Sequence, residues 1–244
     1  DWVLEAECRY VAMESTGIYW QPIYEMLEPC FDGQISILVV NARHMKNVPG
    51  RKTDMRDAQW IATLLRAGLL KGSFIPDKTF RELRHLTRYR KSIVRDITAQ
   101  KNRIDKFLQS SGFRFTAFLS DAFGASGRNI IRHLMEYGNI SREALDRCLK
   151  TQTRKRIDEI LIALNGSLSE HQRGFLRMIF GHLEALEQHR HTVEDAITKE
   201  ITKHEEALSL LCSIPGIDVT AAAAIIAAVS YTHLRAHETL RHLV

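Results

Sequence analysis

The sequence is poor in cysteine and has no long apolar run. Its four cysteines lie far apart and show no paired spacing. This pattern excludes the usual zinc-binding spacings and a disulfide framework, and it fits a reducing compartment. Neither a signal-peptide pattern nor an apolar run of membrane-spanning length is present, so we expect no membrane partner.

Acidic residues are scarce in one stretch of the chain. The 244 residues carry a net charge of +5, but between Arg81 and Arg114 ten lysines and arginines accompany only three acids. A basic stripe on one element indicates a polyanion partner. The alternative is a solvated charged helix face, which needs no ligand. The candidate phosphate ligands of this stretch are Arg84, Arg88, Arg90, Lys91 and Arg95.

The first part of the chain has the pattern of a parallel α/β unit. Residues 8–13 and 35–40 read as strands, the first ending at Glu14, and residues 18–28 and 54–67 read as helices. Residues 29–34 are predicted to form a loop. Tyr19 and Trp20 begin the first of these helices, and we interpret them as core residues rather than as a base-stacking pair.

The remainder is predicted to be mainly helical. Apolar residues recur at close to seven-residue spacing along residues 76–110 and again along residues 169–211, which predicts two long helices paired antiparallel. Between them, residues 129–137, 141–149 and 153–164 read as short helices.

The turn around Gly216 separates the end of the second long helix from an alanine-rich helix. This arrangement is similar to a helix-hairpin-helix, in which backbone amides of the turn hold a DNA phosphate. Asp218 occupies the place of the usual second glycine, which weakens phosphate binding. A plain packing corner is the alternative.

Two acids stand at the start of the predicted helix 54–67. Asp54 and Asp57 are three residues apart and therefore share one helix face. Acids are common in the first turn because they oppose the helix dipole. Arg51, Lys52 and Arg56 could balance the two charges, and so could a divalent metal. Arg51 and Lys52 are also candidate nucleic-acid ligands. A third carboxylate, Glu14, favours the metal, although Glu14 could also pair with Arg51 or Lys52.

Several blocks of the sequence, in their order and spacing, resemble the DEDD transposases of bacterial insertion sequences, which are related to the Piv-type DNA invertases. The resemblance extends over roughly residues 3–229. It is carried by residues 11–20 (VAMESTGIYW), 50–62 (GRKTDMRDAQWIA), 68–70 (GLL), 73–76 (SFIP), 81–84 (RELR), 86–90 (LTRYR) and 213–217 (SIPGI).

The resemblance implies a partial RuvC-like (RNase H-like) α/β domain over residues 1–75. It also implies a helical, coiled-coil region over residues 76–205 and the start of a C-terminal transposase domain over residues 206–229. In that family four carboxylates hold two divalent metals, and Glu14, Asp54 and Asp57 match three of them. The implied cofactor is Mg²⁺, which hard oxygen ligands suit.

The family further implies metal-dependent cleavage and joining of DNA strands, with DNA and a structured guide RNA as partners. It implies a dimer or tetramer in the bacterial cytoplasm, associated with the nucleoid. A junction-resolving endonuclease on the same fold and a non-enzymatic nucleic-acid-binding module are the alternatives.

Two departures from the family pattern concern catalysis. The family's first Asp lies on an earlier strand, and Asp1 does not match it. The family's serine nucleophile lies in a block that this chain does not reach, and neither Ser213 nor Ser230 matches it. We therefore predict a fragment, truncated at both ends, that is inactive alone.

Residues 230–244 do not continue the family pattern and resemble translated sequencing-adapter read-through, so we interpret them as a non-native tail. The histidines in this tail are an alternative metal-binding set, which its origin disfavours: His233, His237 and His242.

Overall fold

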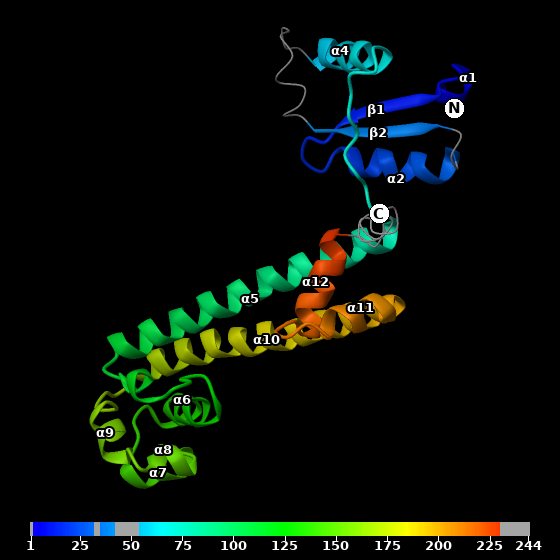
Figure 1. Ribbon diagram of the computed structural model, residues 1–244. Coiled ribbons are helices and arrows are strands. Elements are labelled where there is room, and N and C mark those ends of the chain that lie inside the picture. Colours follow the sequence, from blue (N-terminus) through cyan, green and yellow to red (C-terminus); the bar gives the residue numbers. More distant parts are fainter. Residues whose placement is uncertain (1, 32–34, 42–53, 230–244) are drawn as a thin grey trace. The chain divides into compact units, whose positions relative to one another are not determined.

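A computed structural model describes residues 2–31, 35–41 and 54–229 of the chain. The predictions for Arg51, Lys52 and the tail at residues 230–244 lie outside the described residues. The chain divides into two compact units, Asp1–Asp77 and Lys78–Val244. The elements of both units are labelled in Figure 1.

The first unit is built on two parallel strands, as the sequence predicted. β1 (Tyr10–Glu14) pairs with β2 (Ser36–Val40) in a register that places Glu14 opposite Val40. The short α1 (Trp2–Glu5) precedes β1, α2 (Trp20–Phe31) joins the strands, and α4 (Asp54–Arg66) follows β2. α2 packs against β2 and α4 packs against β1, as Figure 1 shows. The carboxyl ends of both strands therefore meet at one edge.

α2 differs from its prediction at both ends. It runs through Pro29 to Phe31, although a loop was predicted from Pro29 onward. Proline removes one amide from a helix, and in the last turn this costs only the bond to the carbonyl four residues earlier. The prediction that Tyr19 is a core residue is also wrong, because its side chain is 78% exposed just before the helix begins. Trp20 is half-buried and lies edge-on to Tyr24.

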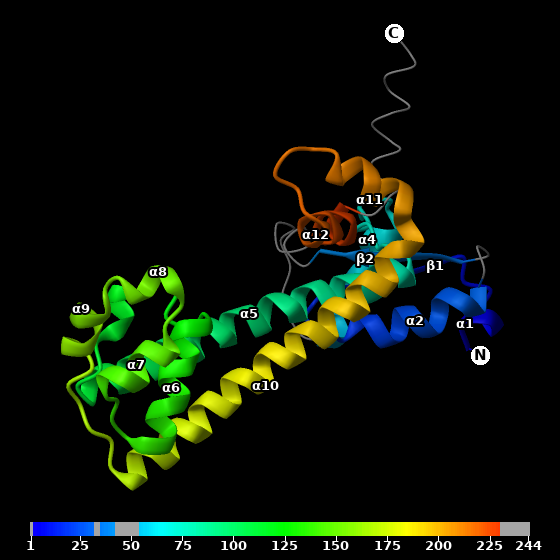
Figure 2. The same cartoon turned by 90° about the horizontal axis from the view of Figure 1, so that it is seen from below.

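The second unit is organised by a pair of long antiparallel helices, α5 (Lys78–Ser110) and α10 (Glu170–Ile201). They run side by side in both Figure 1 and Figure 2. Both bury the predicted apolar seam, with Ile93, Ile97 and Ile104 on α5 and Leu183 and Ile197 on α10 among its members. The predicted antiparallel pairing of two long helices is confirmed.

One polar side chain lies within this seam. Gln100 is buried, and its side-chain amide donates to the carbonyl of Ile179 on α10 at 2.6 Å, while its Oε1 accepts from Arg103. Both ends of the amide are therefore satisfied. A buried polar group that can bond only in one arrangement favours a single register between paired helices.

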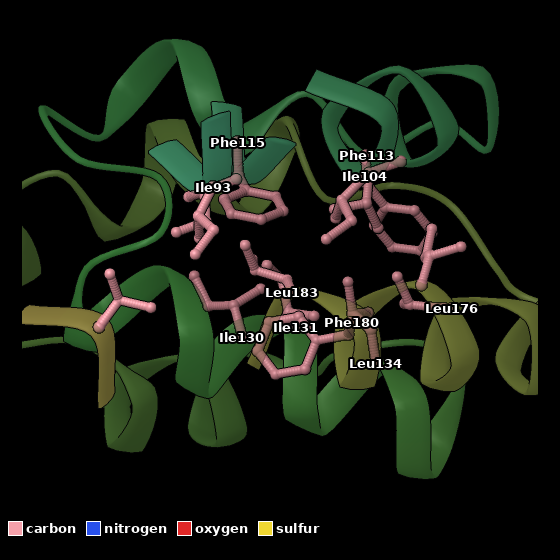
Figure 3. Packing of buried hydrophobic residues seen from close by; sticks show 14 of the residues in the cluster. Ile93, Ile104, Phe113, Phe115, Ile130, Ile131, Leu134, Leu176, Phe180 and Leu183 are labelled. Carbon is pink, nitrogen blue, oxygen red and sulfur yellow. The ribbon is translucent and has the colours of Figure 1, made fainter. Parts of the chain in front are cut away.

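Short helices fill the far end of the hairpin. They are η1 (Phe115–Phe118), α6 (Ala125–Tyr137), α7 (Arg142–Cys148), α8 (Thr151–Arg154) and α9 (Ile157–Ile162). The predicted helix 153–164 is thus two helices, which are separated by the non-helical backbone of Arg156. Figure 3 shows side chains of α6 and α10 turned toward those of α5 and η1 in one continuous core.

The second long helix ends earlier than predicted. α10 stops at Ile201, a 3₁₀ turn (η2, Thr202–His204) follows, and α11 (Glu205–Cys212) begins anew. The adjacent acids Glu205 and Glu206 favour a helix start here because they oppose the dipole of a new amino terminus. α12 (Val219–Val229) then packs against α11 and α5. None of the described helices combines the length and hydrophobicity that crossing a membrane requires.

Candidate metal site and nucleic-acid surface

Glu14 occupies the carboxyl end of β1. The backbone beyond it is held to the neighbouring strand, because the amide of Ser15 donates to the carbonyl of Val40 at 2.9 Å. The hydroxyl of Thr16 donates to Oε1 of Glu14. Glu14 is half-buried, and its carboxylate is therefore oriented by both the strand register and a neighbouring side chain.

The loop that leaves β1 turns sharply at Gly17, whose φ of +58° favours glycine. The contact from Thr16 to Glu14 was not predicted from the sequence. The available signal was a hydroxyl two residues after an acid at a strand end, where such side chains commonly bond to nearby groups.

The first turn of α4 brings a second carboxylate to this unit. Asp57 is half-buried and shares one helix face with Trp60, Ile61 and Leu64, at spacings of three, four and seven residues. Leu64 is only 4% exposed, so this is the face that α4 turns inward, and α4 packs against β1. Asp57 thus lies on the face of α4 that is turned toward the interior of the first unit.

The structure describes the side chains of two of the three predicted acids, Glu14 and Asp57. Asp54 is the first residue of α4, but its side chain lies outside the described residues. Among the side chains that the structure does describe, no group of three acids, histidines or cysteines is placed to hold a metal. Glu14 and Asp57 nevertheless suit a hard cation, since both are carboxylates on packed elements of one unit.

β2 is also bordered by the chain that follows α4. Gly72 forms an antiparallel bridge with Val40, and the amide of Ser73 donates to the carbonyl of Val39 at 2.6 Å. These bonds cover part of the open edge of the two-stranded sheet. The strand that ends opposite Glu14 is therefore held on both of its sides.

In the second unit, the five basic candidates of α5 divide into two groups. Arg84 and Arg90 are engaged within the protein. The guanidinium of Arg84 donates to the carbonyls of Ala227 and Ala228 at 2.9 and 3.0 Å, at the carboxyl end of α12. Burial and the neighbouring Arg88 lower the pKa of Arg84. Arg84 therefore caps a helix that begins 135 residues later.

Arg90 joins the two long helices. Its guanidinium contacts the carboxylate of Glu194 on α10 at 2.7 and 2.8 Å. The same carboxylate has Arg190 at 3.7 Å and His191 at 3.6 Å. Arg90, which interrupts the apolar pattern in the sequence, is thus accounted for by a half-buried ion pair inside the hairpin.

The other three candidates project outward. Arg88, Lys91 and Arg95 are exposed, and none of them forms an ion pair with any residue that the structure describes. Their spacings of three and four residues place them on one face of α5, away from the seam marked by Ile93 and Ile97. This face is a row of uncompensated positive charge.

The turn around Gly216 has the geometry of a helix corner. Gly216 has a φ of +89°, and the amide of Ile217 donates to the carbonyl of Ile214. Asp218 caps α12, because its Oδ1 accepts from the amide of Ala221 at 2.7 Å. A carboxylate therefore occupies the helix end at which a phosphate would bind, and phosphate binding at Gly216 stays a prediction.

The comparison with protein families supplies the class. Residues 1–112 match a family model described as a transposase, a class of enzyme that acts on DNA. The match covers the whole first unit and all of α5. The matched model is that of the IS110-type DEDD transposases of insertion sequences, to which residues 1–112 of the chain are similar. No curated protein matches the chain.

Proposed function

We propose that this chain serves the metal-dependent cleavage and joining of DNA strands, with two Mg²⁺ ions held by Glu14, Asp54 and Asp57, and that it is inactive alone. The observation that carries the proposal is the packing of α4 against β1, the strand that ends at Glu14. This packing brings α4, which carries Asp54 and Asp57, against β1, which carries Glu14.

The residues of the chain supply position and charge. The strand register and the hydroxyl of Thr16 orient Glu14, and the inward face of α4 orients Asp57. When bound, a pair of divalent cations activates the attacking oxygen and stabilises the leaving oxygen at a phosphate. Carboxylates fixed by packed elements lose little entropy when they bind a cation, which favours a preorganised site.

Binding of Mn²⁺, measured by electron paramagnetic resonance, tests the metal site without requiring catalysis. Glu14→Gln and Asp57→Asn should each weaken Mn²⁺ binding by more than about tenfold, since loss of even an outer-shell partner costs that much. Glu5→Gln, which removes an exposed acid of the same unit, is the matched control and should bind as the unmodified protein does. Equal Mn²⁺ affinity in all four proteins would exclude the site.

We also propose that the outward face of α5 holds nucleic acid, namely the DNA ends and a structured guide RNA. Arg88, Lys91 and Arg95 support this role, because phosphate contacts by unpaired cations release counterions and drive binding. Arg84 and Arg90 contribute less, since each already bonds within the protein. We further propose that the protein acts as a dimer or tetramer and that its DNA is that of the nucleoid. Light scattering of the purified chain tests the oligomeric state.

A non-enzymatic binding role is the second candidate, because the α5 face needs no metal. The two functions separate in the variant Asp57→Asn. If this variant retains nucleic-acid binding but loses the Mn²⁺ binding that the unmodified chain shows, the metal-dependent function is supported. If both proteins bind DNA equally and neither of them binds Mn²⁺, the chain is a binding module.

A further inference from the structure

A second basic surface lies at the far end of the helical hairpin, outside the residues predicted from the sequence. The tip segment, residues 147–156, spans the end of α7, all of α8 and the residues before α9. No acid occurs within it. It contains five basic residues among its ten: Arg147, Lys150, Arg154, Lys155 and Arg156.

The backbone of the tip segment is fixed to its neighbours. The amide of Lys150 donates to the hydroxyl of Ser126, a buried residue of α6, at 3.1 Å. Leu149, beside it, is 4% exposed and belongs to the core. At the other end, the guanidinium of Arg156 lies over the ring of Phe118. A segment anchored at both ends presents its side chains at little entropic cost.

Part of the charge of the tip segment is neutralised and part is not. Arg154 pairs with Asp146 at 3.2 Å, and Arg156 pairs with Glu159 at 2.8 Å. The remaining three bases, Arg147, Lys150 and Lys155, are exposed, and within the described part of the chain none of them has an ion-pair partner. Arg147 also donates to the backbone carbonyl of Glu143 at 3.3 Å, and the carboxylate of Glu143 lies near enough to interact with its charge. The three bases leave a local surplus of positive charge at the tip.

The composition of the tip segment selects among polyanions. Single strands are held by aromatic side chains that stack on bases, and protein interfaces are enriched in aromatic residues. The tip segment contains no aromatic residue. Its non-basic side chains are those of Cys148, Leu149, Thr151, Gln152 and Thr153. Hydroxyl, amide and ammonium groups of this kind contact the phosphates of a duplex.

The length of α5 sets the size of the partner. Arg88 lies 22 residues before the end of α5 at Ser110, and at a rise of 1.5 Å per residue this corresponds to roughly 33 Å. One turn of duplex DNA is about as long. Unpaired cations near the start of α5 and in the tip segment, which lies at the far end of the hairpin, therefore suit a partner that offers phosphates over more than one turn.

We propose that the tip segment is a second contact for duplex DNA, separate from the outward face of α5. Only a duplex that extends beyond the outward face of α5 reaches the tip segment. This inference rests on the proposed DNA-binding function. The contact is made to the phosphate backbone by Arg147, Lys150 and Lys155, so it carries no base specificity and depends steeply on salt.

The test compares two double variants of the whole chain. Lys150→Gln/Lys155→Gln removes two cations from the tip, and the matched control Lys199→Gln/Lys203→Gln removes two lysines from α10 and η2. Binding is measured by fluorescence anisotropy on DNA hairpins with a stem of about 8 base pairs, which is shorter than one helical turn, and on duplex DNA of about 60 base pairs, which is several turns long. Circular dichroism melting confirms that each variant folds.

On the longer duplex, the tip variant should lower the slope of log Kd against log salt by about 2, since each lost phosphate contact contributes about 0.9. The control and the short duplex should show no such change. An unchanged slope for the tip variant on the longer duplex overturns the tip contact while leaving the proposed function intact. If the tip variant lowers this slope on duplex RNA but not on duplex DNA, DNA is not the ligand of the tip segment. Failure of the unmodified chain to bind any duplex overturns both.

Discussion

Replacing Arg84 by alanine tests whether this side chain serves the fold or a bound phosphate. Its two hydrogen bonds reach Ala227 and Ala228, whose carbonyls lie in the last turn of α12 and have no partner within that helix. A hydrogen bond to a charged group contributes about 1.5–3 kcal/mol. One of these two is exposed, so solvent screening reduces its share. We expect a loss of about 2 kcal/mol, including the helix-dipole contribution.

Amide hydrogen exchange measures this loss locally. A change of about 2 kcal/mol lowers the protection of the α12 amides by roughly 30-fold. In Arg84→Lys, the protection of the α12 amides should lie between that of the unmodified protein and that of Arg84→Ala. An ammonium keeps the charge but lacks the planar fork that bonds two carbonyls at once. Arg88→Ala is the matched control: it removes a neighbouring exposed arginine and should weaken DNA binding without altering exchange in α12. Unchanged protection in Arg84→Ala, together with weaker DNA binding, would refute the capping role.

Three further predictions concern the second unit. Gln100→Glu should destabilise the hairpin by several kcal/mol in urea unfolding, because it places a buried carboxylate against the carbonyl of Ile179, whereas Gln100→Leu should cost less than about 1.5 kcal/mol. Gly127→Ala should prevent normal packing of α6, seen as a lowered melting temperature, since its Cβ would lie 1.8 Å from the carbonyl oxygen of Ala122. Burial lowers the pKa of His133, so the folded state disfavours its protonation. Stability should decline as the pH falls through about 6.5, the ordinary pKa of histidine, and His133→Gln should reduce that decline in unfolding experiments at pH 5 and pH 8.

The regular elements of the fold were predictable because periodicity and strand order report burial directly. The parallel pairing of β1 with β2 followed from strands alternating with helices, and the α5–α10 pairing followed from two seams of matching length. The breaks within helices were less accessible. Pro29 continues a helix that it was expected to end, and His204 lies in a break that no glycine or proline marks. Both depend on tertiary packing, which local propensity does not contain.

The roles of individual charges were the least predictable part. In the sequence Arg84, Arg88 and Arg90 look alike, yet one caps α12, one projects outward and one pairs with Glu194. The partners of Arg84 and Arg90 are more than one hundred residues away, and only the packed hairpin brings them together. The acids of the candidate metal site, in contrast, were found through the family blocks, and their assembly around a metal stays a prediction.

The pairing of α5 with α10 also limits how this protein can change its reach. Inserting one residue into α5 would turn everything beyond it by about 100°, so that positions such as Ile97 and Ile104 would leave the seam. An insertion of seven residues restores the facing of the helix, provided that α10 lengthens with it. We therefore expect the hairpin of α5 and α10 to differ in length among relatives by steps of roughly 10 Å, with matching changes in both helices.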